Sequence, residues 1–323
     1  MKPLTTTYVS IDKESLDEGS KLDFDVYSAN PSKTHMSLHL QSGSVLNHEQ
    51  RQNLEAIERL YIVKEALPKY KKFIKEHIKK AHDGAVNDVE ARTVDIYVNA
   101  TKAVNDIFSN PESLKNVKAI HHVVDDLVDT VLQDDMAIET LLKLIAHDYY
   151  THTHSINVSI YALSFGAFLK MDDAKLKDLG VSALMHDLGK SKIALEIINK
   201  PGKLTDEEFT ELKKHPLVGY LLAKRLGVSS PDVLSGIKHH HEKVDGTGYP
   251  DRIKGEELSL FAKIIGICDI FDALSTKRSY KDPLSTFETL YLMKQHMSHH
   301  LDMKLLDEFI KMFKRQEKDS SLP

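Results

Sequence analysis

Histidine stands out among the residues of this sequence that could do chemistry. The chain has 18 histidines in 323 residues, several of them in clusters, and imidazole is the commonest metal ligand at neutral pH. His154 lies on a stripe with Val158, Tyr161 and Phe165 that has the spacing of one helix face, so we expect it to point into a core. A single core histidine is more often structural than a ligand. His154 is therefore informative only together with the segments that follow.

A histidine and an aspartate are adjacent in residues 186–190, His-Asp-Leu-Gly-Lys. In a helix, Lys190 lies four residues after His186 and three after Asp187, so the three polar groups share one face. Burying an imidazole, a carboxylate and an ammonium together is costly, and a divalent cation with an anionic substrate would compensate all three. The alternative is a buried ion pair at a helix end.

Three further places carry candidate ligands. His215 precedes a proline, and three consecutive histidines stand at 239–241. Adjacent side chains on a helix differ by about 100°, so three of them fan over about 200° and at most two converge on one site. The alternative for this run is a solvated or metal-scavenging cluster. Asp269 is an acid on an otherwise core-facing helix at 262–276, where the alternative is a buried acid bonded to water or to a cap.

Taken together, these places offer five imidazoles and two carboxylates, without a thiolate. Such a set suits two octahedral first-row metals such as iron or manganese. Zinc is less natural, since it prefers four ligands that often include sulfur. Asp187, in the middle of the set, is the natural bridging carboxylate. The one cysteine, Cys268, cannot form an internal disulfide and is interpreted as a core residue.

The elements that must position these residues are mainly helical. Alternating apolar residues predict strands at 21–28, 36–40 and 60–63, and helices are expected at 47–58 and 66–82. Residues 1–82 are therefore expected to form a small α+β module for regulation or dimerisation, with a spacer as the alternative. Helical stripes follow, in a connector at 83–129 and a helical catalytic domain at 130–323. The expected fold class is mainly α.

Composition excludes several classes of protein. The net charge of −5 argues against a DNA or RNA polymer as partner, because that normally requires a basic face, whereas a small nucleotide needs only a local basic pocket. The longest apolar stretches fall short of the roughly 20 residues that a membrane helix needs, and the N-terminus has no signal-peptide core. We expect a cytoplasmic chain without a membrane span.

Two segments resemble the signatures of the HD-GYP family, cyclic-di-GMP phosphodiesterases of the HD hydrolase superfamily. They are residues 186–190 and residues 240–250, His-His-Glu-Lys-Val-Asp-Gly-Thr-Gly-Tyr-Pro. The similarity covers roughly residues 134–313 and includes the segments 200–205, 215–216 and 269–274. This order of motifs is highly specific. It implies that the helical domain has the all-helical HD-type fold.

The resemblance also implies roles for individual residues, and it leaves His239 outside the metal ligands. One metal would be held by His154, His186, Asp187 and Asp269, and the second by Asp187, His215, His240 and His241. Lys190 would face the scissile phosphate. Lys190 and Asp187 are the two residues to which the resemblance assigns catalysis. Substrate-binding roles are implied for Lys190, Arg278, Lys281, Tyr249 and, as an acid near the entrance, Asp148.

Some family members hold a third metal through a glutamate four residues before the first histidine ligand, and here that position is Tyr150. We therefore expect two metals. The family's Gly-Tyr-Pro loop, here residues 248–250, is implicated in contacts with diguanylate cyclase (GGDEF) domains. A simple helix-ending turn explains the glycines of this loop but not Tyr249.

The activity that the resemblance implies is hydrolysis of cyclic di-GMP. Two neighbouring cations lower the pKa of a bridging water, and the resulting hydroxide attacks phosphorus in line. The first product would be linear 5′-pGpG, and a second cut would give GMP. Two alternatives remain open: an HD phosphohydrolase with another nucleotide substrate, and a cyclic-di-GMP receptor or partner-docking module that has lost catalysis.

Overall fold

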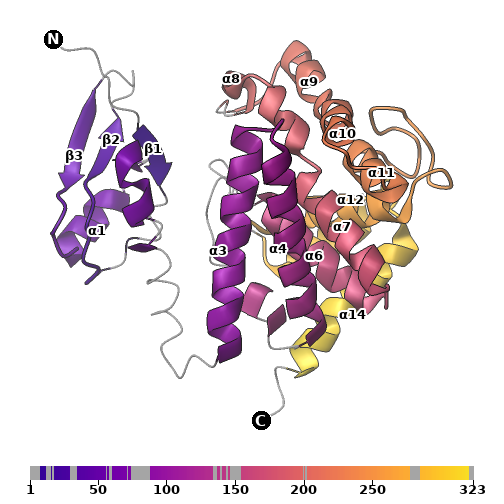
Figure 1. The fold of residues 1–323 in the computed structure, drawn as a ribbon, viewed down its shortest axis with the longest axis horizontal. Helices are drawn as coiled ribbons and strands as arrows, with labels where there is room; N and C mark the ends of the chain where they lie inside the picture. Colours follow the sequence, from indigo (N-terminus) through magenta and orange to yellow (C-terminus); the bar gives the residue numbers. More distant parts are fainter. Residues whose placement is uncertain are drawn as a thin grey trace. The chain divides into compact units, whose positions relative to one another are not determined.

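The computed structural model divides the chain into two compact units, residues 1–94 and 95–323 (Figure 1). The structure describes residues 8–11, 16, 18–29, 35–55, 57, 60–70, 72–73, 88–133, 137–138, 140–142, 145, 154–198, 200, 202–276 and 284–319. The expected fold class, a mainly helical chain with a small α+β region at its N-terminus, is confirmed.

The first unit is built on a four-stranded antiparallel sheet in the order β1-β4-β2-β3. Its strands are β1 (Tyr8–Ile11), β2 (Val26–Ala29), β3 (Met36–Leu40) and β4 (Leu60–Val63). This unit also contains the helix α1 (His48–Glu55) and the 3-10 turn η1 (Lys64–Ala66). Apolar side chains from the strands and from the segments between them are fully buried, Leu22, Phe24 and Leu60 among them, so this unit has its own core.

The sequence predicted the second, third and fourth strands but missed β1. The predicted strand at 21–28 forms regular sheet only from Val26, because residues 23 and 24 make a bend. The helix expected at 47–58 is α1, and Asn47 caps it by accepting a hydrogen bond from the backbone N–H of Gln50 at 2.8 Å. Most of the predicted helix at 66–82 lies outside the described residues.

All the regular elements that the structure describes in the second unit are helices. Its longer helices are α3 (Asp88–Ser109), which begins before the boundary between the units, α4 (Leu114–Gln133), α6 (His154–Phe168), α7 (Asp173–Met185), α10 (His215–Arg225), α11 (Pro231–His239), α12 (Leu260–Ser275), α13 (Thr286–His296) and α14 (Met303–Asp319). Shorter elements are the 3-10 helix η2 (Leu188–Lys192), α8 (Leu195–Ile198) and α9 (Asp206–Leu212).

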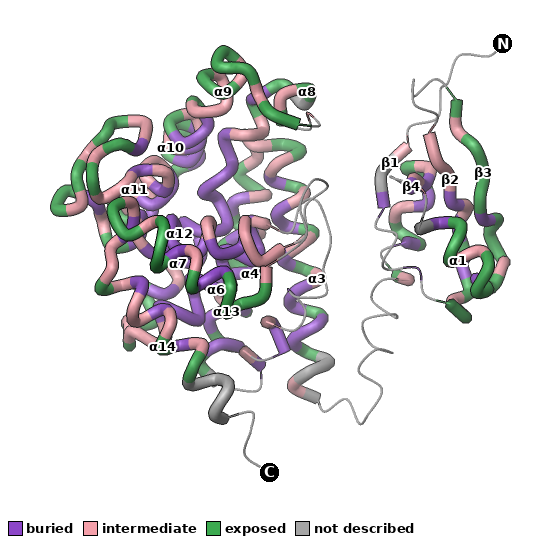
Figure 2. Tube along the Cα trace, turned by 180° about the vertical axis from the view of Figure 1, so that it is seen from behind, coloured by how far each residue is buried: buried purple, intermediate pink, exposed green. Residues whose placement is uncertain are grey.

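The core of this unit is centred on α6, which is buried along almost its whole length (Figure 2). α6 packs against α4, α7 and α12, and α11 packs against α7, α10 and α12. Two of these helices begin at fixed caps, because Asp172 accepts from the N–H of Lys175 and Ser259 accepts from the N–H of Ala262. Within the described part of the chain, no helix combines the length and the apolar character needed to cross a membrane.

Candidate metal centre

His154 is the first residue of α6, and carboxylates fix both sides of its ring. Its Nδ1 lies 2.7 Å from Asp272 Oδ2, and its Nε2 lies 3.0 Å from Asp269 Oδ1. Both acids stand on α12, where a spacing of three residues puts them on one face. Because α6 packs against α12, the sequence-distant histidine and acids come together.

His186 and Asp187 stand where α7 ends. The α-helix does not continue to Lys190 as the helical spacing assumed: it ends at Met185, and Asp187 is the N-cap of the 3-10 helix that follows. In a 3-10 helix, residues three apart eclipse each other. Lys190 Nζ accordingly lies 2.6 Å from Asp187 Oδ2, so the polar groups converge through this tighter turn.

The rings of His186, His215 and His240 are all oriented in the same way. In each case Nδ1 lies within hydrogen-bond distance, 2.7 to 2.9 Å, of the carbonyl oxygen three residues earlier in the chain. An Nδ1–H that donates to a carbonyl fixes the tautomer and leaves Nε2 with a free lone pair, which is the arrangement found in metal-ligating histidines. The three carbonyls belong to Ala183, Leu212 and Ile237.

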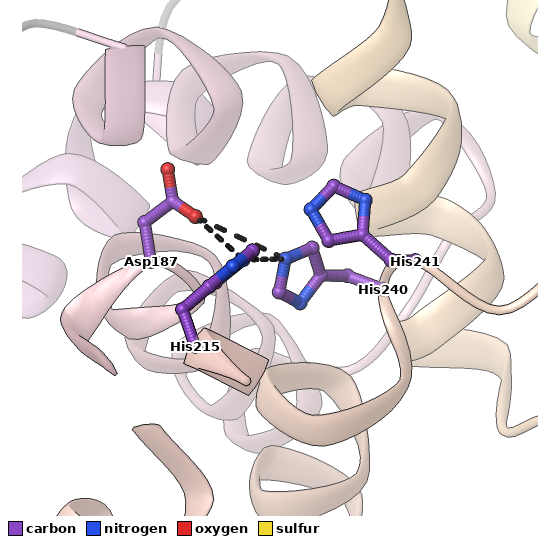
Figure 3. A group of neighbouring side chains, drawn as sticks. All are labelled: Asp187, His215, His240 and His241. Atoms are coloured by element: carbon purple, nitrogen blue, oxygen red, sulfur yellow. Dashed lines mark hydrogen bonds and ion pairs between the residues drawn. The ribbon is translucent and has the colours of Figure 1, made fainter. Parts of the chain in front are cut away.

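Two groups of candidate ligand atoms form in this way. Asp187, His215, His240 and His241 make one group, shown in Figure 3, and His154, His186 and Asp269 make the other. Within each group the ligand atoms all lie within 4.8 Å of one another. The structure thus brings together all seven candidate ligands, from five segments of the chain.

Asp187 lies between the two groups. Its Oδ1 is 3.2 Å from His215 Nε2 and 4.0 Å from His240 Nε2 (Figure 3). Its Oδ2 is 3.5 Å from His186 Nε2 and 3.7 Å from His154 Nε2. Each carboxylate oxygen therefore faces a different group, so Asp187 could contribute a ligand atom to both.

Several of these nitrogen and oxygen atoms are placed to coordinate a cation rather than to form hydrogen bonds with one another. His186 Nε2 and Asp187 Oδ1 are buried and have no hydrogen-bond partner among the residues that the structure describes. The Nε2 atoms of His215 and His240 lie 3.3 Å apart, and with both Nδ1 protons directed at carbonyls two lone pairs would face each other. Leaving buried polar atoms unpaired costs about 1–3 kcal/mol each. A cation coordinated by these nitrogens and carboxylates would satisfy all of them.

The protonation states agree with this fit. Burial lowers the pKa of His186, His240 and His241, in the last case to about 3, so these imidazoles are neutral near pH 7. Burial alone would raise the pKa of Asp187 and Asp269, but the positive charge of Lys190 acts on Asp187, and His154 acts on Asp269. Both pKa values are well below the usual range. Neutral imidazoles and ionised carboxylates are the forms that bind metal.

His154 differs from the other histidines. Burial would lower its pKa, but the hydrogen bonds to Asp269 and Asp272 outweigh burial and raise the pKa to about 10. In the absence of a cation, a proton on Nε2 therefore lies between His154 and Asp269. A cation bound to this nitrogen would take the place of that proton.

Two glycines of the signature segments allow close backbone contacts that position candidate ligands. A Cβ on Gly189 would lie 2.0 Å from the carbonyl oxygen of His215, so this glycine lets α10 approach the segment of Asp187. A Cβ on Gly248 would lie 2.4 Å from the Cα of Glu242. Such distances exclude any side chain at either position, so these glycines have a packing function beyond that of a turn.

The loop after His241 folds back on the site. The ring of Tyr249 stacks on His241 with centroids 4.8 Å apart, and burial raises the pKa of its hydroxyl. Oε1 of the buried Glu242 accepts hydrogen bonds from the backbone N–H groups of Asp251 and Arg252 at 2.6 and 2.8 Å. Glu242 thus ties the end of the loop to its beginning and holds Tyr249 against His241.

Sequence reasoning missed two residues that orient the site. Asp272 is 1% exposed, and besides His154 it contacts Asn157, whose Nδ2 donates to Oδ1 at 2.9 Å. Both residues stand three positions after a candidate ligand in a helix, Asn157 after His154 and Asp272 after Asp269. That spacing was the available signal for their roles.

The remaining predicted residues divide into two sets. His239 points away from His240 and His241, and its Nε2 lies 3.0 Å from Asp251 Oδ2. This agrees with the expectation that at most two of the three adjacent histidines converge on one site. The other set, Asp148, Tyr150, Arg278 and Lys281, lies outside the described residues.

Known proteins resemble the chain in sequence and in structure. A cyclic di-GMP phosphodiesterase of Pseudomonas aeruginosa is 32% identical over 214 residues, 66% of this chain and 51% of that protein. The 3′3′-cGAMP-specific phosphodiesterase 3 of Vibrio cholerae is 32% identical over 212 residues, 62% of this chain and 46% of that protein. The matches therefore span about half the length of these curated relatives.

Among solved structures, Bd1817, a HDG"Y"P protein from Bdellovibrio bacteriovorus, superposes with a TM-score of 0.63 over 95% of this chain and 100% of that one. The sequence identity is 21%, so the similarity is one of fold. These matches confirm the resemblance that the segments 186–190 and 240–250 indicated. Residues 139–305 match the HD domain family, and the chain therefore belongs to that family.

Proposed function

We propose that this chain is a metal-dependent phosphodiesterase that hydrolyses cyclic di-GMP to linear 5′-pGpG and, in a second cut, to GMP. The observation that carries the proposal is the convergence of imidazoles and carboxylates in two groups, with one oxygen of Asp187 facing each. Relatives that are named cyclic di-GMP phosphodiesterases add support for the substrate.

Two divalent cations, iron or manganese, suit this set of nitrogen and oxygen donors. In the proposal one is held by His154, His186, Asp187 and Asp269, and the other by Asp187, His215, His240 and His241. When bound, such ions supply Lewis-acid activation of water and neutralise charge on the phosphate.

Lys190 is the side chain best placed to act on the substrate. Its side chain is 29% exposed, and its ammonium lies at the edge of the buried group, 2.6 Å from Asp187 Oδ2. From there Nζ can donate a hydrogen bond to a phosphate oxygen and stabilise the negative charge that grows in the transition state. Asp187, in turn, keeps the ammonium beside the candidate ligands.

Substrate contacts are proposed for four further residues. The ring of Tyr249, stacked on His241, forms one wall beside the candidate ligands and would limit how a substrate lies against them. The basic side chains of Arg278 and Lys281 would bind phosphate, and Asp148 would lie near the entrance. The roles of these last three stay predictions from the sequence.

A second candidate function is hydrolysis of a mixed cyclic dinucleotide. Three relatives from Vibrio cholerae are named 3′3′-cGAMP-specific phosphodiesterases, and they match this chain at 30–32% identity. The metal chemistry would be the same, and only the contacts to one base would differ. Equal amounts of cyclic di-GMP and 3′3′-cGAMP, supplied to the same metal-loaded protein, separate the two functions by relative rate.

The decisive experiment combines metal content with product identification. Protein purified without added metal is analysed for iron, manganese and zinc, then incubated with cyclic di-GMP, and the products are identified by mass. His186→Ala and Asp187→Ala should abolish hydrolysis while the helical circular dichroism is kept. His299→Ala, which removes an exposed histidine of the same unit, is the matched control and should keep full activity. Tight binding of cyclic di-GMP by metal-loaded protein without hydrolysis would instead identify a receptor.

Several finer predictions remain part of the proposal. They are a cytoplasmic location, a regulatory or dimerising module at 1–82, a connector at 83–129, a catalytic domain at 130–323, and contacts of residues 248–250 with GGDEF domains. Size-exclusion chromatography with light scattering on the full chain tests dimerisation.

A further inference from the structure

A cavity lies between α10 and α11, apart from the seven candidate ligands. Its volume is about 630 Å³, and its walls include Tyr220, Lys224, Val228, Leu234, Lys238 and His239. None of the candidate metal ligands lines it. A volume of this size lies within the range of about 300–1,000 Å³ that holds small-molecule ligands.

The walls of this cavity are basic, although the chain as a whole is acidic. Of the described residues, Lys224, Lys238 and His239 line it and no acidic side chain does, whereas the full sequence has 43 basic against 48 acidic residues. Both ammonium groups lie over the ring of Tyr220, Lys238 Nζ at 5.5 Å and Lys224 Nζ at 5.9 Å from its centroid. The two ammonium groups are therefore held near the same aromatic ring, that of Tyr220, by cation–π contacts.

The basic wall is held in place by a group outside the cavity. Asp251 Oδ2 lies 2.5 Å from Lys238 Nζ and 3.0 Å from His239 Nε2. On its other side, His239 Nδ1 lies 3.2 Å from Ser235 Oγ. Lys224 is different, because among the described residues it has no ion-pair partner. Its ammonium is free to pair with a ligand.

We propose that this cavity binds a small phosphorylated molecule of the size of a nucleoside monophosphate. The ammonium group of Lys224 supplies the charge for a phosphate group, and Lys238, which is paired with Asp251, can donate a further hydrogen bond. The apolar side chains of Val228 and Leu234 supply a surface for the uncharged body of the ligand. The site is separate from the proposed phosphodiesterase centre, and its occupancy does not depend on hydrolysis.

The chain offers a clean test because it contains no tryptophan. Tyr220→Trp places one fluorescent reporter in the cavity of the full chain. We expect GMP to change the fluorescence in a saturable way, and guanosine, which lacks the phosphate, to have little effect at the same concentration. Raising the salt concentration should weaken the response, because salt screens exposed charges.

Matched variants separate this site from binding elsewhere. Lys224→Ala in the reporter protein should raise the Kd for GMP about fivefold, since one charge-assisted contact is lost. Lys213→Ala is the control: Lys213 Nζ lies 4.9 Å from the ring centroid of Phe209 in the same kind of pair, but neither residue lines the cavity. The Lys213 variant should leave the Kd unchanged. Phe209→Trp, as a second reporter, should not respond to GMP.

If Tyr220→Trp disturbs the fold, hydrogen–deuterium exchange on the unsubstituted chain is used in place of fluorescence. GMP should then slow exchange in α10 and α11 of the unsubstituted chain, and Lys224→Ala should reduce this protection. The proposal is overturned if GMP produces neither signal, if guanosine binds as tightly as GMP, or if Lys224→Ala leaves the Kd unchanged.

Discussion

Replacing Asp272 by asparagine would isolate the effect of one buried carboxylate that touches a candidate ligand without being one. Oδ2 of Asp272 lies 2.7 Å from His154 Nδ1, and Oδ1 accepts from Asn157 Nδ2 and Thr276 Oγ1, each at 2.9 Å. The carboxylate thus accepts three hydrogen bonds at once. It also selects the tautomer of His154 that leaves the Nε2 lone pair free.

An asparagine cannot satisfy the same three partners. If its oxygen faces Asn157 and Thr276, its NH₂ group donates to His154 Nδ1, and a neutral imidazole must then carry its proton on Nε2. If it flips, its NH₂ group faces the NH₂ group of Asn157. One orientation loses the tautomer of His154 that leaves Nε2 free for a cation. The other loses the hydrogen bond that Asn157 donates. Loss of this kind of support typically costs 10- to 100-fold in metal affinity or activity, which is about 1.4–2.8 kcal/mol.

The assay is metal content after dialysis against a fixed concentration of manganese, together with the rate of cyclic di-GMP hydrolysis. Asp302→Asn is the matched control, since Asp302 pairs with Lys263 on α12 at 3.2 Å but contacts none of the candidate ligands. The control should keep its metal content and rate. If Asp272→Asn also keeps both, then His154 is not oriented by Asp272, and the reasoning from tautomers fails.

Three further predictions concern the elements around the site. Gly189→Ala should lower the free energy of unfolding by more than about 2 kcal/mol, because its Cβ would meet backbone atoms of His215 at 2.0 Å and of Gly219 at 2.6 Å, and overpacking against backbone is not relieved by side-chain movement. Urea unfolding measures this free energy. Gly219→Ala is the comparison, since its Cβ would meet only atoms at 3.2 Å or more, and an equally small loss of stability in Gly189→Ala would contradict the prediction. Glu242→Ala should release the loop at 245–252 and reduce hydrolysis. Glu242→Gln, which keeps the accepting oxygen, should retain most of the hydrolysis rate. An equal loss of rate in both variants would show that the charge matters rather than the two hydrogen bonds. Asp302→Ala should cost about 1 kcal/mol of stability at pH 7, since Oδ1 accepts from N–H groups at the start of α14. The pKa of Asp302 is lowered, although burial alone would raise it, because the N–H of Leu305 and the ammonium of Lys263 favour the ionised form. Its contribution is therefore present above the unfolded pKa of about 4 and is lost as the pH falls through the folded pKa, so wild type and variant should converge in thermal melts at acid pH.

Some of the seven candidate ligands could be predicted because they break a local rule, and the others, such as His215 and His241, were implied by the resemblance to the family's signatures. Histidine and aspartate on core-facing positions are costly without a partner, so His154, Asp187 and Asp269 stood out against their apolar neighbours. The signature spacing then grouped residues that are more than a hundred positions apart. Secondary structure was predictable where the periodicity was strong, as in α12, expected at 262–276 and found at Leu260–Ser275.

Other features depend on packing that the sequence does not display locally. The change from α7 to a 3-10 helix at Asp187 is accompanied by a close approach of Gly189 to α10, which is a tertiary contact. Asp272 and Asn157 looked like ordinary positions of buried stripes until their hydrogen bonds could be seen. Strand β1, which was missed, pairs with β4 over Tyr8–Ile11, and this long-range pairing is not visible in the sequence.

The arrangement of the site explains why its imidazoles come from helix ends. His215 is the first residue of α10, His186 is the C-cap of α7, and His240 is the C-cap of α11. At a helix end the chain turns away, so side chains from several helices can meet without their backbones colliding. For His186 and His240, at the C-terminal ends of α7 and α11, Nδ1 can donate to a carbonyl of the last turn, which satisfies that carbonyl and frees Nε2 for a cation in the same step. The ends of these helices and the candidate ligands are therefore stabilised by the same hydrogen bonds. A substitution that frays α7 or α11 should for this reason reduce metal binding before it unfolds the domain.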